Sequence, residues 1–385
     1  MNQRMTLEWV LCAACFVAVV LTPRIVAAQA APPTGTKPPD DTPSIRVGAT
    51  IFTNYSYQTE PKITDSDGNL VHRSSFDVTR SYINVTGNLS HILAFRITPD
   101  IVRETNPESS LAGSLTFRIK YAFLQANLDD WITRGSWARL GVQETPYVDF
   151  AQGIYRYRFQ GTMFPERAGY LASADAGASF HYNLPSSYGD VHVGVYNGEG
   201  YGRAEVNSQK GLMTRATVRP FAGQTPALRG LRGHLFHVAD SYVKNGERQR
   251  TVGAVTYEYP FVTAGFEYVD ARDQRSALPG MAPMNGSGYS LWVIPRTSKG
   301  WEGLIRYDHL TPNTSRALAP FATAGNLTTT LDSQQQNRVI AGIAYWFKLQ
   351  GSVTASLLVD YDAQLFENLT AAPTKTVAVH ALVNF

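Results

Sequence analysis

The feature that most constrains this chain is a two-faced pattern that repeats along nearly all of it. Segments of about ten residues alternate apolar and polar side chains with a period of two, and turn-forming residues separate them. The last segment, TVAVHALVNF, has Val377, Val379, Ala381, Val383 and Phe385 on one face and Ala378, His380, Leu382 and Asn384 on the other. Because successive side chains of a strand point to opposite faces, the pattern predicts β-strands.

The number and spacing of these segments predict a closed barrel. We count about sixteen, which start near Ser44, Ser75, Ile92, Leu115, Ser136, Leu171, Asp190, Leu212, Leu231, Arg250, Phe261, Ser287, Trp301, Gln336, Ser352 and Thr374. Single-chain bacterial barrels have an even number of antiparallel strands. The predicted connections alternate between short ones, such as GNLSH and TSKGW, and long ones, such as 59–73 and 311–335. A soluble sandwich, the alternative for any single alternating segment, has no reason to sort its loops in this way.

The composition also favours strands that cross a membrane. Charged residues make up 17% of the 385, against about 25% in soluble domains. No stretch reaches the roughly 18 to 20 consecutive apolar residues of a membrane helix. The formal net charge is only +3, with no strong basic stripe, which excludes a typical nucleic-acid binder. The sequence therefore predicts an all-β, antiparallel transmembrane barrel over 45–385.

The N-terminal 44 residues are predicted to lie outside that barrel. Residues 1–30 contain an early Arg4, an uncharged apolar run and the small-residue stretch Ala28-Gln29-Ala30, which is typical of a secretory signal peptide. Both cysteines lie in this segment, so the remaining chain has no disulfide framework. Residues 31–44 are rich in proline and polar residues, and we expect an extended linker there.

If the apolar faces contact lipid, the opposite faces line the lumen. In LTFRIKYAFL, for example, the pattern sets Phe117, Ile119 and Tyr121 against Arg118 and Lys120. The basic residues predicted to line the pore are Arg46, Arg80, Arg96, Arg118, Lys120, Arg139, Arg215, Arg219, Arg306 and Arg338. The acidic residues predicted there are fewer: Glu258, Glu267, Asp308, Asp360 and Asp362. An excess of basic side chains attracts anions. The alternative is that the arginines pair with the acids and only support the wall.

One long connection is unusual in its composition. PYVDFAQGIYRYRFQGTMFPERAGY, residues 146–170, combines aromatic residues with Arg156, Arg158 and Arg167. A loop of this length in a compact fold is usually functional. Folded into the barrel, it would form a constriction loop that presents guanidinium groups suited to carboxylate and phosphate. Folded outward, it would be a surface loop.

Several segments together resemble a known family. VTRSYINVTGNL with LAFRITPDI, ARLGVQETPYVDFAQ, YRFQGTMFPERAG and VYNGEGYG are similar to successive landmarks of the phosphate-selective porin O/P family. The resemblance covers Phe76 to Gly202. It implies a sixteen-stranded diffusion porin that assembles as a homotrimer, with Arg156, Arg158 and Arg167 as candidates for the constriction.

These observations predict a bacterial outer-membrane porin for passive diffusion of small hydrophilic solutes, mildly favouring anions and phosphate-type anions in particular. The expected partners are outer-membrane lipid, the diffusing solutes and the barrel-assembly machinery, for which the terminal Phe385 would be a label. We expect no catalytic residue, no cofactor and no metal. The alternatives are an outer-membrane barrel enzyme and a closed structural or adhesive barrel.

Two further motifs have simple structural explanations. His234 and His237 are three residues apart in a predicted strand, so their side chains should point to opposite faces and not form a metal site. Asp65 and Asp67 in TDSDGN would suit calcium, but an Asp-Gly turn explains them equally well. Aromatic residues near predicted strand ends, among them Tyr257, Tyr259 and Tyr345, are expected to form girdles at the membrane interfaces.

Overall fold

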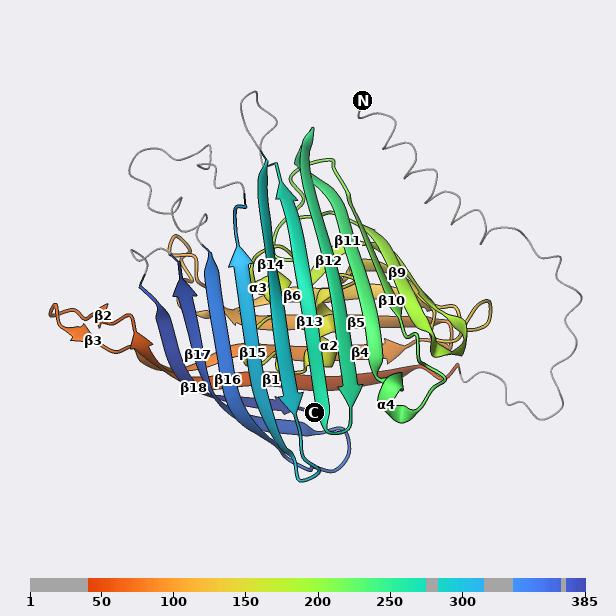
Figure 1. Cartoon of the computed structure of the whole chain (residues 1–385). Helices are drawn as coiled ribbons and strands as arrows, with labels where there is room; N and C mark the ends of the chain where they lie inside the picture. The colour runs from red at the N-terminus through yellow and green to blue at the C-terminus, as the bar shows by residue number, and fades with distance from the viewer. Residues whose placement is uncertain (1–40, 275–282, 315–334, 368–371) are drawn as a thin grey trace, which may run out of the picture. The chain divides into compact units, whose positions relative to one another are not determined.

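The computed structural model describes residues 41–274, 283–314, 335–367 and 372–385. In this part of the chain, sixteen strands form one closed antiparallel barrel (Figure 1). They are β1 (Ser44–Glu60), β4 (Ser74–Asn88), β5 (Leu93–Arg103), β6 (Leu115–Asn127), β7 (Trp137–Glu144), β8 (Ala174–Asn183), β9 (Gly189–Tyr196), β10 (Gly211–Val218), β11 (Leu231–Val243), β12 (Gly246–Tyr259), β13 (Val262–Asp273), β14 (Met284–Pro295), β15 (Trp301–Thr311), β16 (Gln336–Trp346), β17 (Thr354–Phe366) and β18 (Thr374–Asn384). The predicted fold class is confirmed. The predicted signal peptide and residues 31–40 of the predicted linker lie outside the described residues.

The remaining elements are short. They are the hairpin β2 (Ile63–Thr64) and β3 (Leu70–Val71), the helices α2 (Val148–Tyr155), α3 (Phe164–Arg167) and α4 (Pro226–Arg229), and the 3₁₀ turn η1 (Pro185–Ser187). No helix in the described ranges has the length and apolar character needed to cross a membrane. At the tip of the β2–β3 hairpin, the Asp65 carboxylate accepts the backbone N–H groups of Asp67 and Asn69 at 3.0 and 2.8 Å. The Asp65 carboxylate therefore accepts N–H groups of its own turn, as expected for a structural Asp-Gly turn.

The barrel closes between the first and last strands. The backbone N–H of Ala49 donates to the carbonyl of Phe385 at 2.9 Å, and the N–H of Phe385 donates back at 3.0 Å. On β18 the side chains of Val377 and Val379 are 42% and 40% exposed, whereas His380 is 6% exposed. The predicted alternation of the closing strand is thus confirmed, with its apolar face outward.

Deleting Phe385 should lower the yield of inserted barrel. The deletion removes both backbone hydrogen bonds to Ala49 at the seam, and an unclosed edge leaves backbone groups unpaired in hydrocarbon. The measurement is the heat-modifiable, folded fraction in purified outer membranes. Phe385→Tyr, which keeps the seam and an aromatic end, is the control, and normal insertion of the deletion variant would contradict the expectation.

The structure corrects the predicted phase of one strand. Tyr121 was expected to face lipid, but Lys120 and Tyr121 both point inward and are 5% and 3% exposed. The pairing register shifts at this point, where Thr98 pairs with Tyr121 and Pro99 pairs with Ile119. Proline cannot donate to the ladder, and a β-bulge on the partner strand accommodates it. A bulge adds one residue and inverts every later side chain on that strand.

The sorting of loops by length holds with two exceptions. At the end with the long loops, β11 and β12 are joined by the tight turn Lys244–Asn245, where Asn245 has a φ of 66°. Asparagine tolerates this left-handed conformation, which favours a two-residue hairpin. At the opposite end, the β10–β11 connection is longer than a tight turn and contains α4. In outer-membrane barrels the end with short turns is the periplasmic one.

Aromatic side chains gather at this short-turn end. The rings of Tyr257 and Tyr259 stack at 6.3 Å, and those of Trp301 and Tyr345 lie 5.0 Å apart. Trp301 is 52% exposed on the outer face. These contacts agree with the predicted aromatic girdle at a membrane interface.

A histidine at the same end links two parts of the chain that are far apart in sequence. Nδ1 of His91 lies 2.6 Å from a carboxylate oxygen of Asp41, which precedes β1, and Nε2 lies 3.0 Å from a carboxylate oxygen of Asp130 in the β6–β7 turn. Hydrogen bonds to the Asp41 carboxylate raise the pKa of His91, and the same contact lowers the pKa of Asp41. Because folding raises the pKa of His91, the bridge is most stable when the His91 imidazole is protonated.

The bridge should therefore be complete below the ordinary histidine pKa of 6.5 and be lost as the pH rises through the raised value. Asp130→Asn removes one carboxylate and should lower the pKa of His91. An NMR titration of the His91 imidazole in the wild type and the variant measures this difference. Equal titration curves would show that the carboxylate of Asp130 does not interact with the imidazole.

Candidate functional site

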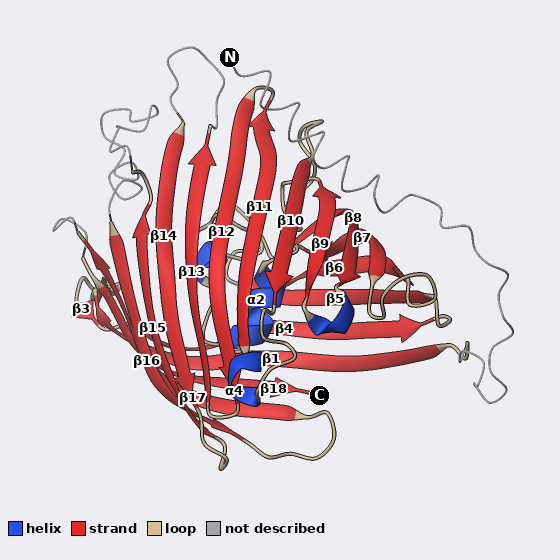
Figure 2. Cartoon of the chain, turned by 45° about the vertical axis from the view of Figure 1, so that its right-hand side comes forward, coloured by secondary structure: helices blue, strands red, loops and turns tan. Residues whose placement is uncertain are grey.

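The connection between β7 and β8 folds into the barrel. Figure 2 shows α2, in blue, inside the ring of strands. The helix ends at Arg156, which has a φ of 57° and turns the chain. Pro165 occupies the first turn of α3, where a missing N–H does no harm. Of the two paths considered from the sequence, the loop therefore takes the inward one, in the position of a constriction loop.

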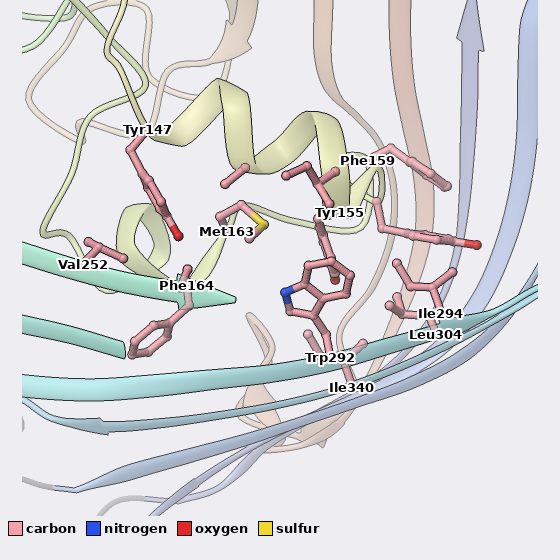
Figure 3. Packing of buried hydrophobic residues seen from close by; sticks show 14 of the residues in the cluster. Tyr147, Tyr155, Phe159, Met163, Phe164, Val252, Trp292, Ile294, Leu304 and Ile340 are labelled. Carbon is pink, nitrogen blue, oxygen red and sulfur yellow. The ribbon is translucent and has the colours of Figure 1, made fainter. Parts of the chain in front are cut away.

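An apolar contact holds this loop against one side of the lumen. Tyr155, at the end of α2, points toward Trp292 on β14, with ring centroids 5.3 Å apart (Figure 3). Ile294, Leu304 and Ile340 on β14, β15 and β16 are 0% exposed in the same cluster. Burying such a side chain contributes about 1.5–3 kcal/mol. The simple assumption that inward faces are polar is therefore wrong on this side, because the wall there is the floor on which the loop packs.

Polar contacts at the edge of the cluster anchor the loop. The Tyr147 hydroxyl donates to Glu267 at 2.8 Å, and the Tyr157 hydroxyl donates to Glu302 at 2.8 Å. From the wall, Arg306 donates to the backbone carbonyl of Thr162 at 3.1 Å. Since buried carboxylates need donors, these contacts fix the loop in one position.

The three arginines proposed for the constriction have different surroundings. Arg156 pairs with Glu302 at 3.1 Å and lies 3.8 Å from the Trp346 ring centroid. Arg167 is 15% exposed and lies 3.5 Å from Asp308. These two side chains hold the loop to the wall. Arg158 is partly exposed, and its Nε has no hydrogen-bond partner among the described residues.

Opposite the apolar floor, strands β4 to β7 form a wall rich in arginine. Arg80 and Arg118 share the carboxylate of Asp100, which is 0% exposed, with the Arg118 contact at 3.1 Å. The Arg118 guanidinium also donates to the hydroxyl of Tyr201 at 2.9 Å. Tyr201 reaches this position because the β9–β10 connection also turns inward, with its N–H on the carbonyl of Ala174. Two cations thus share one carboxylate.

The same arrangement occurs on the neighbouring strands. Arg96 and Arg139 bind the two oxygens of Glu144 at 2.6 and 2.7 Å. Lys120 lies 3.6 Å from Asp149 at the start of α2. The β4–β7 wall and the loop residues facing it therefore carry more positive than negative charge.

The other strands do not show this excess. Arg338 pairs with Asp362 at 2.5 Å. In the described part of the chain, the inward carboxylates of Glu267 and Asp360 form no ion pair with a lysine or arginine. These two negative charges offset the extra positive charge at Asp308 and at Glu302, where two arginines share one carboxylate. Apart from the arginines at the short-turn end, the positive excess is thus concentrated on one side of the lumen.

The remaining predicted lining residues have mixed positions. Arg46 borders a cavity of about 270 Å³ at the short-turn end, together with Arg96 and Arg139. Arg215 and Arg306 are on the inward face, but they are 3% and 1% exposed beneath the loop. They are corrected from pore-lining to loop-supporting residues, since the loop covers them. Arg219 follows β10 at the same end as Arg46.

The sequence did not single out several residues of this site. Asp100 shares a face with Arg96 and Thr98 by simple alternation, so the pattern could have identified it. Glu144 ends its strand and Asp149 begins a helix, where alternation stops. Tyr201 comes from a loop that carries no periodic signal. His234 and His237 do lie on opposite faces, with His234 6% exposed.

No protein-family model and no curated protein matches the chain. Solved structures do match it. OmpTdeltaL8, a loop L8 deletion mutant of the outer membrane protein OmpT of Vibrio cholerae, is 12% identical, with a TM-score of 0.57 over 90% of this chain and 100% of that one. OmpT in its trimer form is 11% identical, with a TM-score of 0.52 over 89% and 100%. Salmonella typhi OmpF, in a complex with daunomycin, is 10% identical, with a TM-score of 0.57 over 89% and 97%.

At these identities the comparisons establish the fold. A closed barrel whose apolar side chains face outward has no free edge and suits hydrocarbon. The chain is a transmembrane β-barrel of the bacterial outer membrane with a porin-like fold.

Proposed function

We propose that the protein is a water-filled channel for passive diffusion of small hydrophilic solutes and that it mildly favours anions. The observation that carries the preference is the pair of clusters on β4–β7, each with two arginines on one carboxylate, Asp100 or Glu144. A wall with excess positive charge beside a low-dielectric barrel attracts anions and repels cations.

The alternative, in which each arginine is neutralised by its own acid, fits these clusters less well. Arg118 and Arg96 remain 37% and 29% exposed although each contacts a carboxylate. A guanidinium that shares its carboxylate keeps free N–H donors, and these suit planar or tetrahedral oxyanions. This geometry supports phosphate-type anions as solutes, in line with the resemblance to the phosphate-selective porin O/P family.

The proposal includes a non-enzymatic role and a trimeric assembly. In the described residues, the outward-facing His237 and His309 bond to Thr251 and Asn337, and neither bonds to a serine. This supports a channel over a barrel hydrolase, which needs a nucleophile paired with a base. The trimer form of OmpT among the similar structures supports the same assembly for this chain.

The test is the current through the purified full-length protein in a planar bilayer. We expect stepwise conductance, a reversal potential on the anion side under a potassium chloride gradient, and a reduced chloride current when phosphate is added. A cation-side reversal potential would overturn the anion preference. A folded barrel that carries no current would indicate the closed structural or adhesive alternative.

A further inference from the structure

A second cavity lies at the short-turn end of the lumen, away from the β4–β7 clusters. It has a volume of about 470 Å³ and lies between Phe150 of α2 and the connections that follow β6, β8 and β10. Three arginines border it, namely Arg134, Arg219 and Arg232. The lining residues as a whole come from three separate connections and from strands β8 to β11, so the cavity exists only in the folded barrel.

The charges around this cavity do not cancel. Asp190 also borders it, but its carboxylate is paired with Arg215 and lies 3.2 Å from His181. Arg232 pairs with Glu258 at 2.7 Å. Within the described ranges, Arg134 and Arg219 form no ion pair with a carboxylate. The cavity therefore has two positive charges in excess.

Two buried donors at the cavity have no acceptor. The Nε atoms of Arg219 and Arg232 are shielded from solvent and lack a hydrogen-bond partner among the described residues. A buried donor without a partner is unfavourable, and N–H groups of arginine suit the oxygens of an oxyanion. Thr133 and Thr217 also border the cavity and can donate through their hydroxyl groups. The chemistry of this site is that of an oxyanion receptor.

Part of the cavity lining is apolar. Phe150, Leu184 and Pro185 line it. A cavity of roughly 150 Å³ is enough for benzene, so about 470 Å³ exceeds what an inorganic anion fills. We propose that this cavity binds a small organic carboxylate whose apolar body is about the size of one ring. The carboxylate contacts Arg219 and Arg134, and the ring packs against Phe150 and Pro185.

The experiment is isothermal titration of the folded full-length protein in detergent with benzoate, benzamide and inorganic phosphate. We expect benzoate to bind more tightly than both benzamide, which lacks the charge, and phosphate, which lacks the ring. Arg219→Gln should weaken benzoate binding at least about tenfold, the effect of one charged hydrogen bond. Arg134→Gln should weaken it in the same direction.

Arg229→Gln is the matched control, because Arg229 is exposed in α4 of the same connection and does not line the cavity. Heat modifiability checks that each variant is folded. Equal binding of benzamide, or unchanged benzoate binding in both variants, would overturn the site. Phosphate binding as tightly as benzoate would overturn the organic part of the proposal. The measurement is made at equilibrium, so its result does not depend on whether the channel conducts.

Discussion

Arg118→Glu should remove most of the anion preference of the channel. The change lowers the charge of the β4–β7 wall by two at a side chain that is 37% exposed. Two charges acting on an ion about 10 Å away in water contribute about 0.8 kcal/mol, with opposite signs for an anion and a cation. The anion-to-cation permeability ratio should therefore change by about 1.7 kcal/mol, or about sixteenfold. The reversal potential under a salt gradient measures this ratio, and dilute salt is needed because ions screen the effect beyond about 10 Å at 0.1 M.

The comparison requires two further variants. Arg118→Gln removes one charge and should produce about half of the free-energy change, or about a fourfold effect on the ratio. It also avoids placing a second carboxylate beside Asp100. Arg272→Glu makes the same charge reversal at an exposed residue paired with Glu247, away from the clusters, and should leave the ratio nearly unchanged. Equal shifts in Arg118→Glu and Arg272→Glu would show that the wall clusters do not set selectivity.

Trp346→Ala should loosen the constriction loop and raise the conductance. The indole N–H of Trp346 donates to the Tyr157 hydroxyl at 3.1 Å, and its ring packs edge-on against Phe159 with centroids 6.0 Å apart. Arg156 lies over the same ring. Truncating a buried tryptophan costs about 3–5 kcal/mol. Because the barrel itself is held by its closed ladder, we expect this loss mainly in the docking of the loop.

Single-channel recordings and limited proteolysis measure the effect. The variant should show larger and noisier current steps than the wild type. A protease should also cleave the variant within residues 145–173, where the wild type is resistant. Trp346→Phe keeps a ring and should have a smaller effect. Trp301→Ala removes a tryptophan of the outer face that is 52% exposed and should leave the loop docked. Wild-type conductance and protease resistance in Trp346→Ala would show that Trp346 does not hold the loop.

The candidate site was only partly predictable from the sequence. Alternation placed Arg80, Arg96 and Arg118 on the inward face because period two is a local property of the strand. It did not reveal that Asp100 is shared by two of these arginines, because the three residues come from different strands. Nor did it reveal that Arg215 lies under the loop, since the path of a long connection is not encoded in any periodic pattern.

By itself the sequence determined the barrel, its strands and the direction of its faces. A strand in a membrane must alternate, and a chain without long apolar runs can span the membrane only as a closed sheet. Only the tertiary structure decided which side of the lumen is apolar and which is basic. That division depends on where the loop packs, and the contact of Tyr155 with Trp292 joins the loop to a strand far away in the sequence. The same holds for the bulge at Lys120 and Tyr121, which depends on the pairing of β5 with β6.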